Sequence, residues 1–233
     1  MHLDRIEISA EPFSWEFAAI RRAEINEHFA SFKRKRPAVW NGRVLLLNRF
    51  LIRDATLLGS CFETDYASFI AWLDWNCPDP TVYNFFAVAA LRTADGAYLV
   101  AEMAPYTAGA GRLHFPGGTP DPSDIDDRGA FDPIGHLSRE LREETGIGIN
   151  ELDAESGWVL VRDRCSVALI RRLISRQNAD DLRRRVIRHI RAEQQPELSD
   201  MHIIRGPAQL DARMPSFVTT FLQEQWRRGT AKM

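Results

Sequence analysis

The sequence predicts an α+β protein, an α/β/α sandwich whose mixed sheet lies between helices, with a smaller N-terminal α+β extension. Two apolar segments, 82–92 and 97–101, flank Asp95-Gly96, which is typical of a β-hairpin. Later segments at 133–145 and 180–193 have the apolar spacing of amphipathic helices. Because strands and helices are interspersed without an internal repeat, we expect helices packed on a mixed sheet.

Length and composition exclude several classes of protein. The chain has 233 residues, of which 45% are hydrophobic and 27% charged, so it is long enough for a packed core and is not wholly disordered. Thirty Lys and Arg against 32 Asp and Glu give a net charge of −2, which provides no overall basic field for nucleic acid. No stretch approaches the roughly 18 apolar residues of a membrane span. The N-terminus lacks a signal peptide's apolar stretch, so we expect a cytoplasmic protein.

The three cysteines carry no spacing typical of a cross-linked or metal-bound fold. Cys61, Cys77 and Cys165 are far apart and odd in number. No Cys-x-x-Cys pair is present, so the sequence indicates neither a disulfide framework nor a structural zinc site. We therefore expect three reduced cysteines packed as small hydrophobic residues.

The N-terminal extension is expected to be a small α+β unit. A helix is predicted near residues 16–32, followed by strands at 44–47 and 55–58 and by a helix from about residue 66 that Thr64 or Asp65 caps. The segment Cys77-Pro78-Asp79-Pro80 interrupts the pattern. We place a boundary there, giving an extension at 1–80 and a main domain at 81–233.

The main domain is expected to continue with strands and helices after its first hairpin. A glycine-rich segment, His114-Phe115-Pro116-Gly117-Gly118, precedes a polar loop and a helix. Further strands are predicted at 158–162, 166–173 and 198–205, and further helices at 180–193 and 216–227.

The helix after the polar loop carries the residues that indicate chemistry. Asp132 is a good N-cap, Pro133 suits the first helical position, and Gly146 is a good terminator. At 100° per residue, Glu140, Glu143 and Glu144 fall on one face, within roughly 100° of one another. His136 lies between them one turn earlier, and Arg139 flanks them.

Three clustered carboxylates repel one another unless a cation lies among them. Mg²⁺ or Mn²⁺ suits such oxygen ligands, and it can bridge a diphosphate and activate water. The alternative is a solvated acidic stripe paired with arginines.

The segment Arg139-Glu140-Leu141-Arg142-Glu143-Glu144-Thr145-Gly146-Ile147 resembles the Nudix box, whose core reads Arg-Glu-apolar-x-Glu-Glu-x-Gly-apolar. A chance match in a chain of this length is on the order of 1 in 10⁵ on average residue usage. Gly117-Gly118 resembles the opening glycines of the box. The resemblance implies the Nudix-like mixed sheet between helices and a metal-dependent hydrolase.

The sequence departs from the box at one acidic position. The family has a Glu six residues after the second glycine and eight before the Arg, but these counts lead to Asp124 and to Phe131. The loop therefore carries a seven-residue insertion. We expect one of four acids to replace the missing Glu, namely Asp121, Asp124, Asp126 or Asp127.

The resemblance implies a role for each matching residue. Glu140, Glu143, Glu144 and the Gly118 carbonyl would hold Mg²⁺ or Mn²⁺, with Glu143 and Glu144 also counted among the catalytic residues. Arg139 would orient the cluster. The general base in the family is often an acid outside the box, and Glu197 is our candidate, with Glu193 second.

The remaining candidates are less specific. Arg112 and Arg36 could contact a substrate phosphate, although the segment 33–36 as a whole is more typical of a solvated basic face than of a phosphate clamp. His136 is a further candidate metal ligand. The arginines at 183–185, 188 and 191 invite a nucleic-acid interpretation, against which the near-zero net charge argues.

The sequence therefore predicts hydrolysis of a phosphoanhydride in a nucleoside diphosphate linked to another group. The extension is loosely similar to that of the UDP-glucose-cleaving branch of the family, which favours a nucleotide sugar as the small-molecule substrate. Three alternatives stay open: a Nudix-fold nucleotide-binding or regulatory protein, an RNA-directed decapping-like hydrolase, and an isomerase on the same fold. No membrane partner is expected, a nucleic-acid partner is disfavoured, and the oligomeric state is undetermined.

Overall fold

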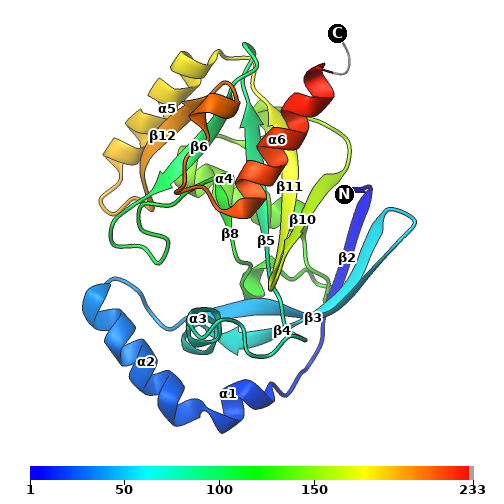
Figure 1. The fold of residues 1–233 in the computed structure, drawn as a ribbon, viewed down its shortest axis with the longest axis vertical. Helices are drawn as coiled ribbons and strands as arrows, with labels where there is room; N and C mark the ends of the chain where they lie inside the picture. Colours follow the sequence, from blue (N-terminus) through cyan, green and yellow to red (C-terminus); the bar gives the residue numbers. More distant parts are fainter. Residues whose placement is uncertain (231–233) are drawn as a thin grey trace.

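The computed structural model describes residues 1–230, in which two sheets and six α-helices form the fold (Figure 1). The helices are α1 (Glu16–Ile20), α2 (Arg22–Lys35), α3 (Tyr66–Asp74), α4 (Pro133–Thr145), α5 (Ala179–Ala192) and α6 (Ser216–Thr230). The main strands are β1 (His2–Leu3), β2 (Arg5–Ala10), β3 (Arg43–Arg53), β4 (Thr56–Asp65), β5 (Asn84–Arg92), β6 (Tyr98–Met103), β10 (Trp158–Asp163), β11 (Ser166–Ile174) and β12 (Leu198–Ile204). Three two-residue strands complete the sheets: β7 (Leu113–His114), β8 (Gly117–Gly118) and β9 (Asp153–Ala154).

The larger sheet is mixed, as the sequence predicts. Its strand order is β1-β10-β11-β5-β6-β12, with β7, β8 and β9 paired to β6, β5 and β11. Strands β11 and β5 run parallel, and the other pairs in this sheet are antiparallel. The α+β prediction is confirmed.

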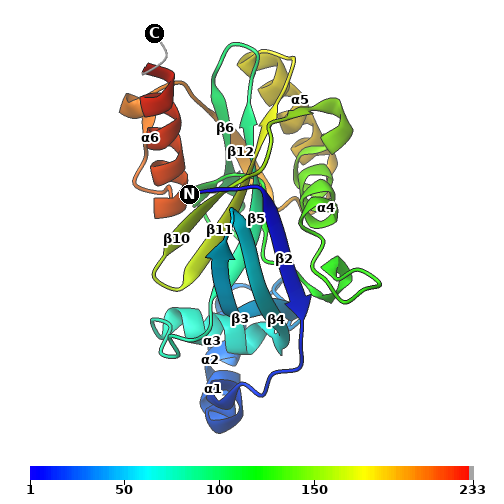
Figure 2. The same cartoon turned by 90° about the vertical axis from the view of Figure 1, so that its right-hand side faces the viewer.

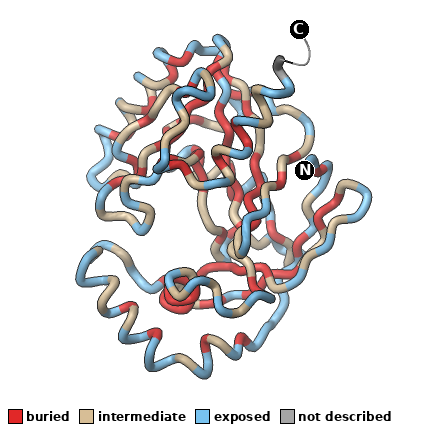
Figure 3. Tube along the Cα trace, in the orientation of Figure 1, coloured by how far each residue is buried: buried red, intermediate tan, exposed pale blue. Residues whose placement is uncertain are grey.

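The larger sheet lies between two helical layers. Helices α4 and α5 cover one face, and α6 covers the other (Figure 2). Leu137 and Leu141 of α4 are fully buried in the core on the first face, whereas Val218 and Phe221 of α6 belong to a second core. Buried residues follow the strands of both sheets, and exposed residues lie on the outer sides of the helices (Figure 3). This arrangement is the predicted sandwich.

The predicted limits of α4 are confirmed by its capping contacts. The side chain of Asp132 accepts hydrogen bonds from the backbone N–H groups of Ile134 and Gly135, at 3.1 and 3.0 Å. Gly146 ends the helix in the left-handed conformation, with φ 68°, which favours glycine. These caps fix where the acidic residues of α4 begin and end along the sheet.

The N-terminal extension contains a second sheet of order β2-β4-β3, with helices packed beside it. The predicted strands at 44–47 and 55–58 lie within the longer β3 and β4, and Asp65 caps α3 by accepting from the backbone N–H of Ser68. The single helix predicted at 16–32 is wrong in one respect, because it is interrupted. Arg21 leaves helical geometry at φ −98° and ψ 20°, and its guanidinium lies 4.2 Å from the Trp75 ring centroid.

The extension and the main domain share strands and a core. Strand β1 belongs to the larger sheet, where it pairs with β10, and Leu3 is fully buried there. Leu45 and Leu57 of the smaller sheet lie in the same hydrophobic cluster as Leu137 of α4. The division at residue 80 therefore stays a prediction. Residues 2–3 of the predicted extension lie in the larger sheet.

The inserted loop, 119–132, is held by the extension. The backbone N–H of Phe131 donates to the carbonyl of Ile8 at 2.8 Å, and that of Ala10 donates to Gly129 at 2.8 Å. At the other end of the loop, Leu45 N–H donates to the carbonyl of Pro120 at 2.8 Å. Both ends of the loop are thus tied to strands of the smaller sheet.

The expectation of three reduced cysteines is wrong. A disulfide joins Cys77, after α3, to Cys165, in the turn between β10 and β11, across a sequence separation of 88. Cys61 is free and buried. Sequence spacing could not reveal the pair because it forms only when the extension docks on the main domain. Within residues 1–230, no helix has both the length and the apolar character needed to span a bilayer.

Candidate active site

The three glutamates of α4 differ sharply in their surroundings. Glu144 is buried, and its Oε2 accepts a hydrogen bond from the backbone N–H of Gly117 at 2.9 Å. The side chain of Glu140 is 15% exposed and lies 2.7 Å from Nη1 of Arg139. The side chain of Glu143 is 62% exposed and lies 3.3 Å from the same atom. The cluster therefore runs from the sheet outward to solvent.

The two glycines of β8 allow the backbone to approach these carboxylates. Gly117 has φ 132°, and a Cβ there would lie 2.2 Å from the carbonyl oxygen of Ala87 on β5. A Cβ on Gly118 would lie 3.0 Å from Oε2 of Glu140. Only glycine fits the first position without strain, and the second leaves no room between the backbone and the carboxylate. The paired glycines thus set the distance between β8 and α4.

Glu197 belongs to the same acidic cluster although it is distant in sequence. Its carbonyl accepts from the backbone N–H of Ala104 at 2.8 Å, which fixes it directly before β12. Burial of its carboxylate raises the pKa of Glu197, and repulsion from Glu143 and Glu193 adds to the effect, although the residue as a whole is exposed. The structure thus places Glu197 within electrostatic range of Glu143.

Burial and mutual repulsion disfavour the ionised forms of the inner carboxylates. Burial raises the pKa of Glu144 well above its ordinary value; repulsion from Glu140 and Glu197 adds to this, and the hydrogen bond from Gly117 opposes it. Burial also raises the pKa of Glu140, while Arg139 pulls it down. A cation placed among these oxygens would relieve the repulsion.

Arg139 connects the cluster to the inserted loop. Its Nη2 donates to both carboxylate oxygens of Asp124, at 2.9 and 3.0 Å, while its Nη1 faces Glu140 and Glu143. Burial lowers the pKa of Arg139, but the hydrogen bond to Asp124 and the charges of Glu140, Asp124 and Glu143 more than offset this. Arg139 therefore stays cationic between Asp124 and the two glutamates, and its role in orienting the carboxylates stays a prediction.

Of the four acids proposed to replace the missing Glu, Asp124 is the one that contacts Arg139 closely. Asp121 lies 4.0 Å from Arg139 and caps the short 3₁₀ turn Pro122–Asp124. Asp126 instead accepts from the backbone N–H groups of Arg128 and Ala130 within the loop, and Asp127 is exposed. The forward count from Gly118 thus leads to the acid that contacts Arg139.

His136 is committed to hydrogen bonds on both sides of its ring. Its Nδ1 lies 2.9 Å from Oδ2 of Asp124, and its Nε2 lies 3.0 Å from the carbonyl oxygen of Gly118. The geometry argues against His136 as a metal ligand, because each ring nitrogen already faces an oxygen partner.

The donor set fits a hard divalent cation in chemistry, although it is not a preformed cage. Within residues 1–230, no three His, Cys, Asp or Glu side chains converge as a ready-made metal site. Glu140 and Glu143 face Arg139, whereas Glu144 offers a buried carboxylate with one backbone hydrogen bond. Oxygen ligands of this kind suit Mg²⁺ and Mn²⁺.

The two candidate substrate-binding arginines border the loop that leads to the glycines. Arg36 donates through Nε to the carbonyl of Thr107 at 3.1 Å, and its guanidinium lies 4.7 Å from the Phe32 ring centroid. Arg112 is exposed, directly before β7. Residues 33–35 are exposed on the last turn of α2, as the solvated alternative predicts.

Two titratable residues outside the box have shifted pKa values and carry no signal in the sequence. Leu113 and Phe115 pack in the core under α6, so alternation directs His114 to the α4 face of the sheet. Burial lowers the pKa of its imidazole. In α3, burial raises the pKa of Tyr66 to about 12, with repulsion from Glu197 adding and Arg36 opposing. The extension therefore interacts electrostatically with the acidic cluster through Tyr66.

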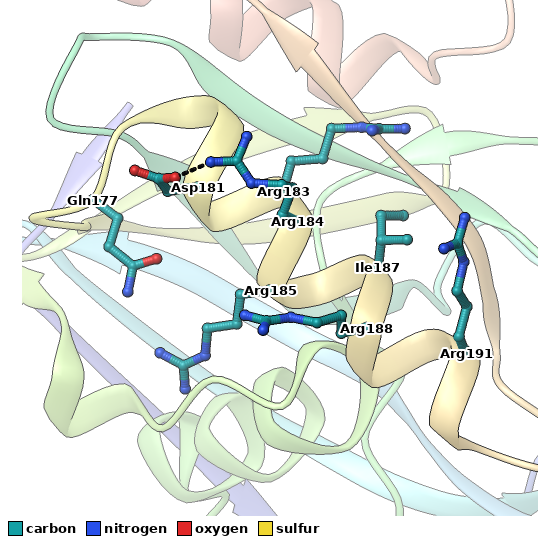
Figure 4. A pocket seen from close by; sticks show the side chains of 8 residues that line it. All are labelled: Gln177, Asp181, Arg183, Arg184, Arg185, Ile187, Arg188 and Arg191. Atoms are coloured by element: carbon teal, nitrogen blue, oxygen red, sulfur yellow. Dashed lines mark hydrogen bonds and ion pairs between the residues drawn. The ribbon is translucent and has the colours of Figure 1, made fainter.

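The arginine-rich helix α5 forms a separate feature. A pocket of about 520 Å³ follows this helix (Figure 4) and holds none of the acidic residues of the box. Three of its arginines form ion pairs: Arg183 with Asp200, Arg184 with Asp181, and Arg185 with Glu151. These pairings weaken the nucleic-acid interpretation of the arginine run.

The comparisons with known proteins give matches among solved structures alone. No protein-family profile and no curated protein match this chain. The matching structures include RenU, a Nudix hydrolase from M. smegmatis, with 13% identity over 64% of this chain and 85% of that one at a TM-score of 0.42. The MutT protein from Methanosarcina mazei has 17% identity over 63% and 95%, at 0.39. The Nudix domain of Shewanella oneidensis NrtR, solved with ADP ribose, has 17% identity over 68% and 97%, at 0.43.

The named relatives belong to the family whose box the sequence resembles. Identities of 13–17% assign no residue roles to this chain. The roles discussed below therefore rest on the contacts within this molecule.

Proposed function

We propose that this chain is a Nudix-type hydrolase that uses Mg²⁺ or Mn²⁺ to cleave a phosphoanhydride bond in a nucleoside diphosphate linked to another moiety, with a nucleotide sugar as the favoured substrate. The observation that carries this proposal is the buried carboxylate of Glu144, held by Gly117 N–H at 2.9 Å beside Glu140 and within electrostatic range of Glu197. A buried acidic cluster of this kind is costly for a fold unless it serves a cation or a reaction.

The metal would be held by Glu140, Glu143, Glu144 and the carbonyl of Gly118. Bound there, a divalent ion supplies charge neutralisation for the diphosphate and lowers the pKa of a water. Arg139 keeps Glu140 and Glu143 in place, since its Nη1 lies 2.7 and 3.3 Å from their oxygens. Asp124 holds the other side of the same guanidinium.

Glu197 is the proposed general base. It lies outside α4, directly before β12, and its charge interacts with that of Glu143. Its role is to accept a proton from the attacking water at its carboxylate. Glu193 is the second candidate, and it is exposed and 3.2 Å from Nε2 of His189. That ion pair makes Glu193 the weaker choice.

The part of the substrate remote from the cleaved bond is proposed to lie toward the N-terminal extension. Tyr66 of α3 interacts electrostatically with Glu197 and with Arg36 of α2, and Arg112 lies directly before β7. Two guanidinium groups and a phenol suit the phosphates and the ring of a nucleotide. The extension would thereby contribute to the choice of substrate.

The test is a hydrolysis screen with product analysis, run with Mg²⁺ and with Mn²⁺. The panel contains nucleotide sugars, ADP-ribose, dinucleoside polyphosphates, coenzyme A, nucleoside triphosphates and capped RNA. Release of two phosphate-bearing products from a nucleoside diphosphate derivative, lost without metal, supports the proposal. Cleavage of capped RNA alone would support the decapping-like alternative, and an isomerised product without phosphate release would support the isomerase.

A second candidate is a Nudix-fold protein that binds a nucleotide without cutting it. It is favoured by the observation that, in the described part of the chain, no three acidic side chains converge as a ready-made cage. Tight binding of an intact nucleotide in the same screen, without products under either metal, would establish this alternative.

A further inference from the structure

A buried histidine links the inserted loop to the glycine strand. The side chain of His136 is 0% exposed, and that of Asp124 is 3% exposed. The Nδ1 of His136 lies 2.9 Å from Oδ2 of Asp124, and its Nε2 lies 3.0 Å from the carbonyl oxygen of Gly118. A carboxylate and a carbonyl oxygen are both acceptors, so each ring nitrogen of His136 faces an acceptor oxygen within hydrogen-bond distance.

We propose that His136 is a positioning residue that holds the Gly118 carbonyl beside Glu140 and thereby shapes the metal site. This inference rests on the function proposed above. His136 precedes Arg139 by three residues on α4, so both lie on one face of the helix. The bridge therefore runs from the inserted loop, through α4, to β8.

Gly118 also lies close to Glu140, so the orientation of its peptide matters for the proposed metal site. The Cα of Gly118 lies so close to Glu140 that a Cβ would be 3.0 Å from Oε2. The carbonyl is held by His136 at 3.0 Å. The peptide is thus fixed between a histidine and a glutamate of the same helix. Loss of the histidine would remove one restraint on the carbonyl while leaving Glu140 and the pairing of β8 with β5 in place.

Asp124 explains why a histidine occurs in this arrangement. Asp124 receives two hydrogen bonds from Arg139 and one from the backbone N–H of Asp121, at 2.9 Å. Its carboxylate therefore fixes Nδ1 of His136, and that contact turns Nε2 toward Gly118. The inserted loop acts on the metal site through this side chain.

The alternative is a histidine that merely fills and stabilises the core. Three substitutions separate the two roles. In His136→Asn, the amide nitrogen falls near the position of Nδ1 and retains the contact with Asp124. In His136→Gln, the amide nitrogen reaches the position of Nε2 and retains the contact with Gly118. His136→Ala removes both contacts. His28→Asn is the matched control, because its amide nitrogen falls near Nδ1 and loses the Nε2 contact with Asp74, which lies 2.9 Å away in the extension.

The experiment measures Mn²⁺ affinity by calorimetry, kcat and KM on the substrate found in the screen, and hydrogen exchange of residues 121–132. We expect His136→Ala to lower Mn²⁺ affinity and kcat by roughly 10-fold or more, in the range seen for residues that orient metal ligands. His136→Gln should recover most of this loss without restoring exchange protection of the loop. His136→Asn should restore loop protection while metal affinity and kcat stay low.

Two outcomes would overturn the proposal, and they are distinguishable. If wild-type protein binds no Mn²⁺ and hydrolyses nothing, the proposed function fails and the positioning role fails with it. If wild type is active, but metal affinity and kcat in all three variants fall only in proportion to the loss of thermal stability, His136 is only a core residue. The proposed function then stands.

Discussion

Arg139 and Asp124, separated by 15 residues, are joined by two hydrogen bonds of 2.9 and 3.0 Å from one guanidinium nitrogen. The same guanidinium faces Glu140 and Glu143 through its other terminal nitrogen. Arg139 is therefore the point at which the inserted loop and the acidic helix are held together. Disturbing Asp124 should affect the fold of the loop first and the carboxylate cluster second.

The pH dependence of stability tests the Asp124 contact. Burial by itself raises the pKa of Asp124, but the hydrogen bond and charge of His136, the backbone N–H of Asp121 and Arg139 together lower it to about 2. Because the folded-state pKa lies below the unfolded value of roughly 3.9, this carboxylate stabilises the fold above about pH 4. That contribution, roughly 2–3 kcal/mol, is lost as the pH falls toward 2.

The measurement is urea unfolding of wild type and Asp124→Asn between pH 2 and 7. The variant should be less stable at neutral pH, and the difference should shrink as the pH falls toward 2. Asp127→Asn, at an exposed position of the same loop, is the control. A difference that stays constant across the whole pH range would show that Asp124 acts without its charge.

Glu197→Gln tests the proposed general base. The substitution keeps the size of the side chain but removes its ability to accept a proton, so kcat should fall by about 10²–10⁴-fold while KM changes little. Steady-state kinetics at saturating Mg²⁺ measures the effect. Glu193→Gln is the matched control because Glu193 lies four residues earlier and is exposed. A larger loss in the control than in Glu197→Gln would transfer the role to Glu193.

Arg36→Met tests the contribution of the extension to substrate binding. The methionine keeps an apolar side chain beside Phe32 but removes the charge, so KM should rise by roughly 10-fold with kcat nearly unchanged. Arg34→Met is the control, because Arg34 is exposed on the last turn of α2. Equal kinetic constants for wild type and Arg36→Met would place the substrate away from the extension.

The Cys77–Cys165 disulfide is expected to stabilise the docking of the extension. The bond closes a long segment, with a sequence separation of 88, so its removal should lower the free energy of unfolding by about 2–4 kcal/mol. Thermal and urea unfolding of wild type and Cys77→Ser measure the loss. A reducing agent should destabilise wild type and leave the variant unchanged. If reduction has no effect on wild type, the bond contributes nothing to stability.

Caps, turns and helical spacing depend on a few neighbouring residues, so the sequence predicted these parts of the fold. The α4 helix was predicted with its N-cap Asp132 and its terminating Gly146, because caps act within a few residues. The β5–β6 hairpin followed from Asp95-Gly96 and the apolar segments beside it. The positions of the three α4 glutamates on one face likewise followed from helical geometry.

The contacts that long-range docking creates were not predictable in this way. Strand β1 has two residues, and its pairing with β10 joins segments more than 150 residues apart. The forward and backward counts disagree, so the sequence left four aspartates open, and the choice depends on the position of Arg139 in space. The Cys77–Cys165 bond also depends on that docking. His136 was first considered as a ligand because spacing on a helix does not reveal that both its ring nitrogens are engaged.

The central claim is that the carboxylates around Glu144 form a divalent metal site. The most direct measurement is calorimetric titration of metal-free protein with Mn²⁺ at two pH values, on wild type and Glu144→Gln. We predict binding by wild type that strengthens as the pH rises, because burial and repulsion raise the pKa of Glu144 and Glu140 and protons must leave as the metal binds. Glu144→Gln, which keeps an oxygen for the Gly117 hydrogen bond, should bind Mn²⁺ at least 10-fold more weakly, in line with typical losses at metal sites. Absence of Mn²⁺ binding by wild type at both pH values, or equal binding by wild type and Glu144→Gln, would contradict the claim.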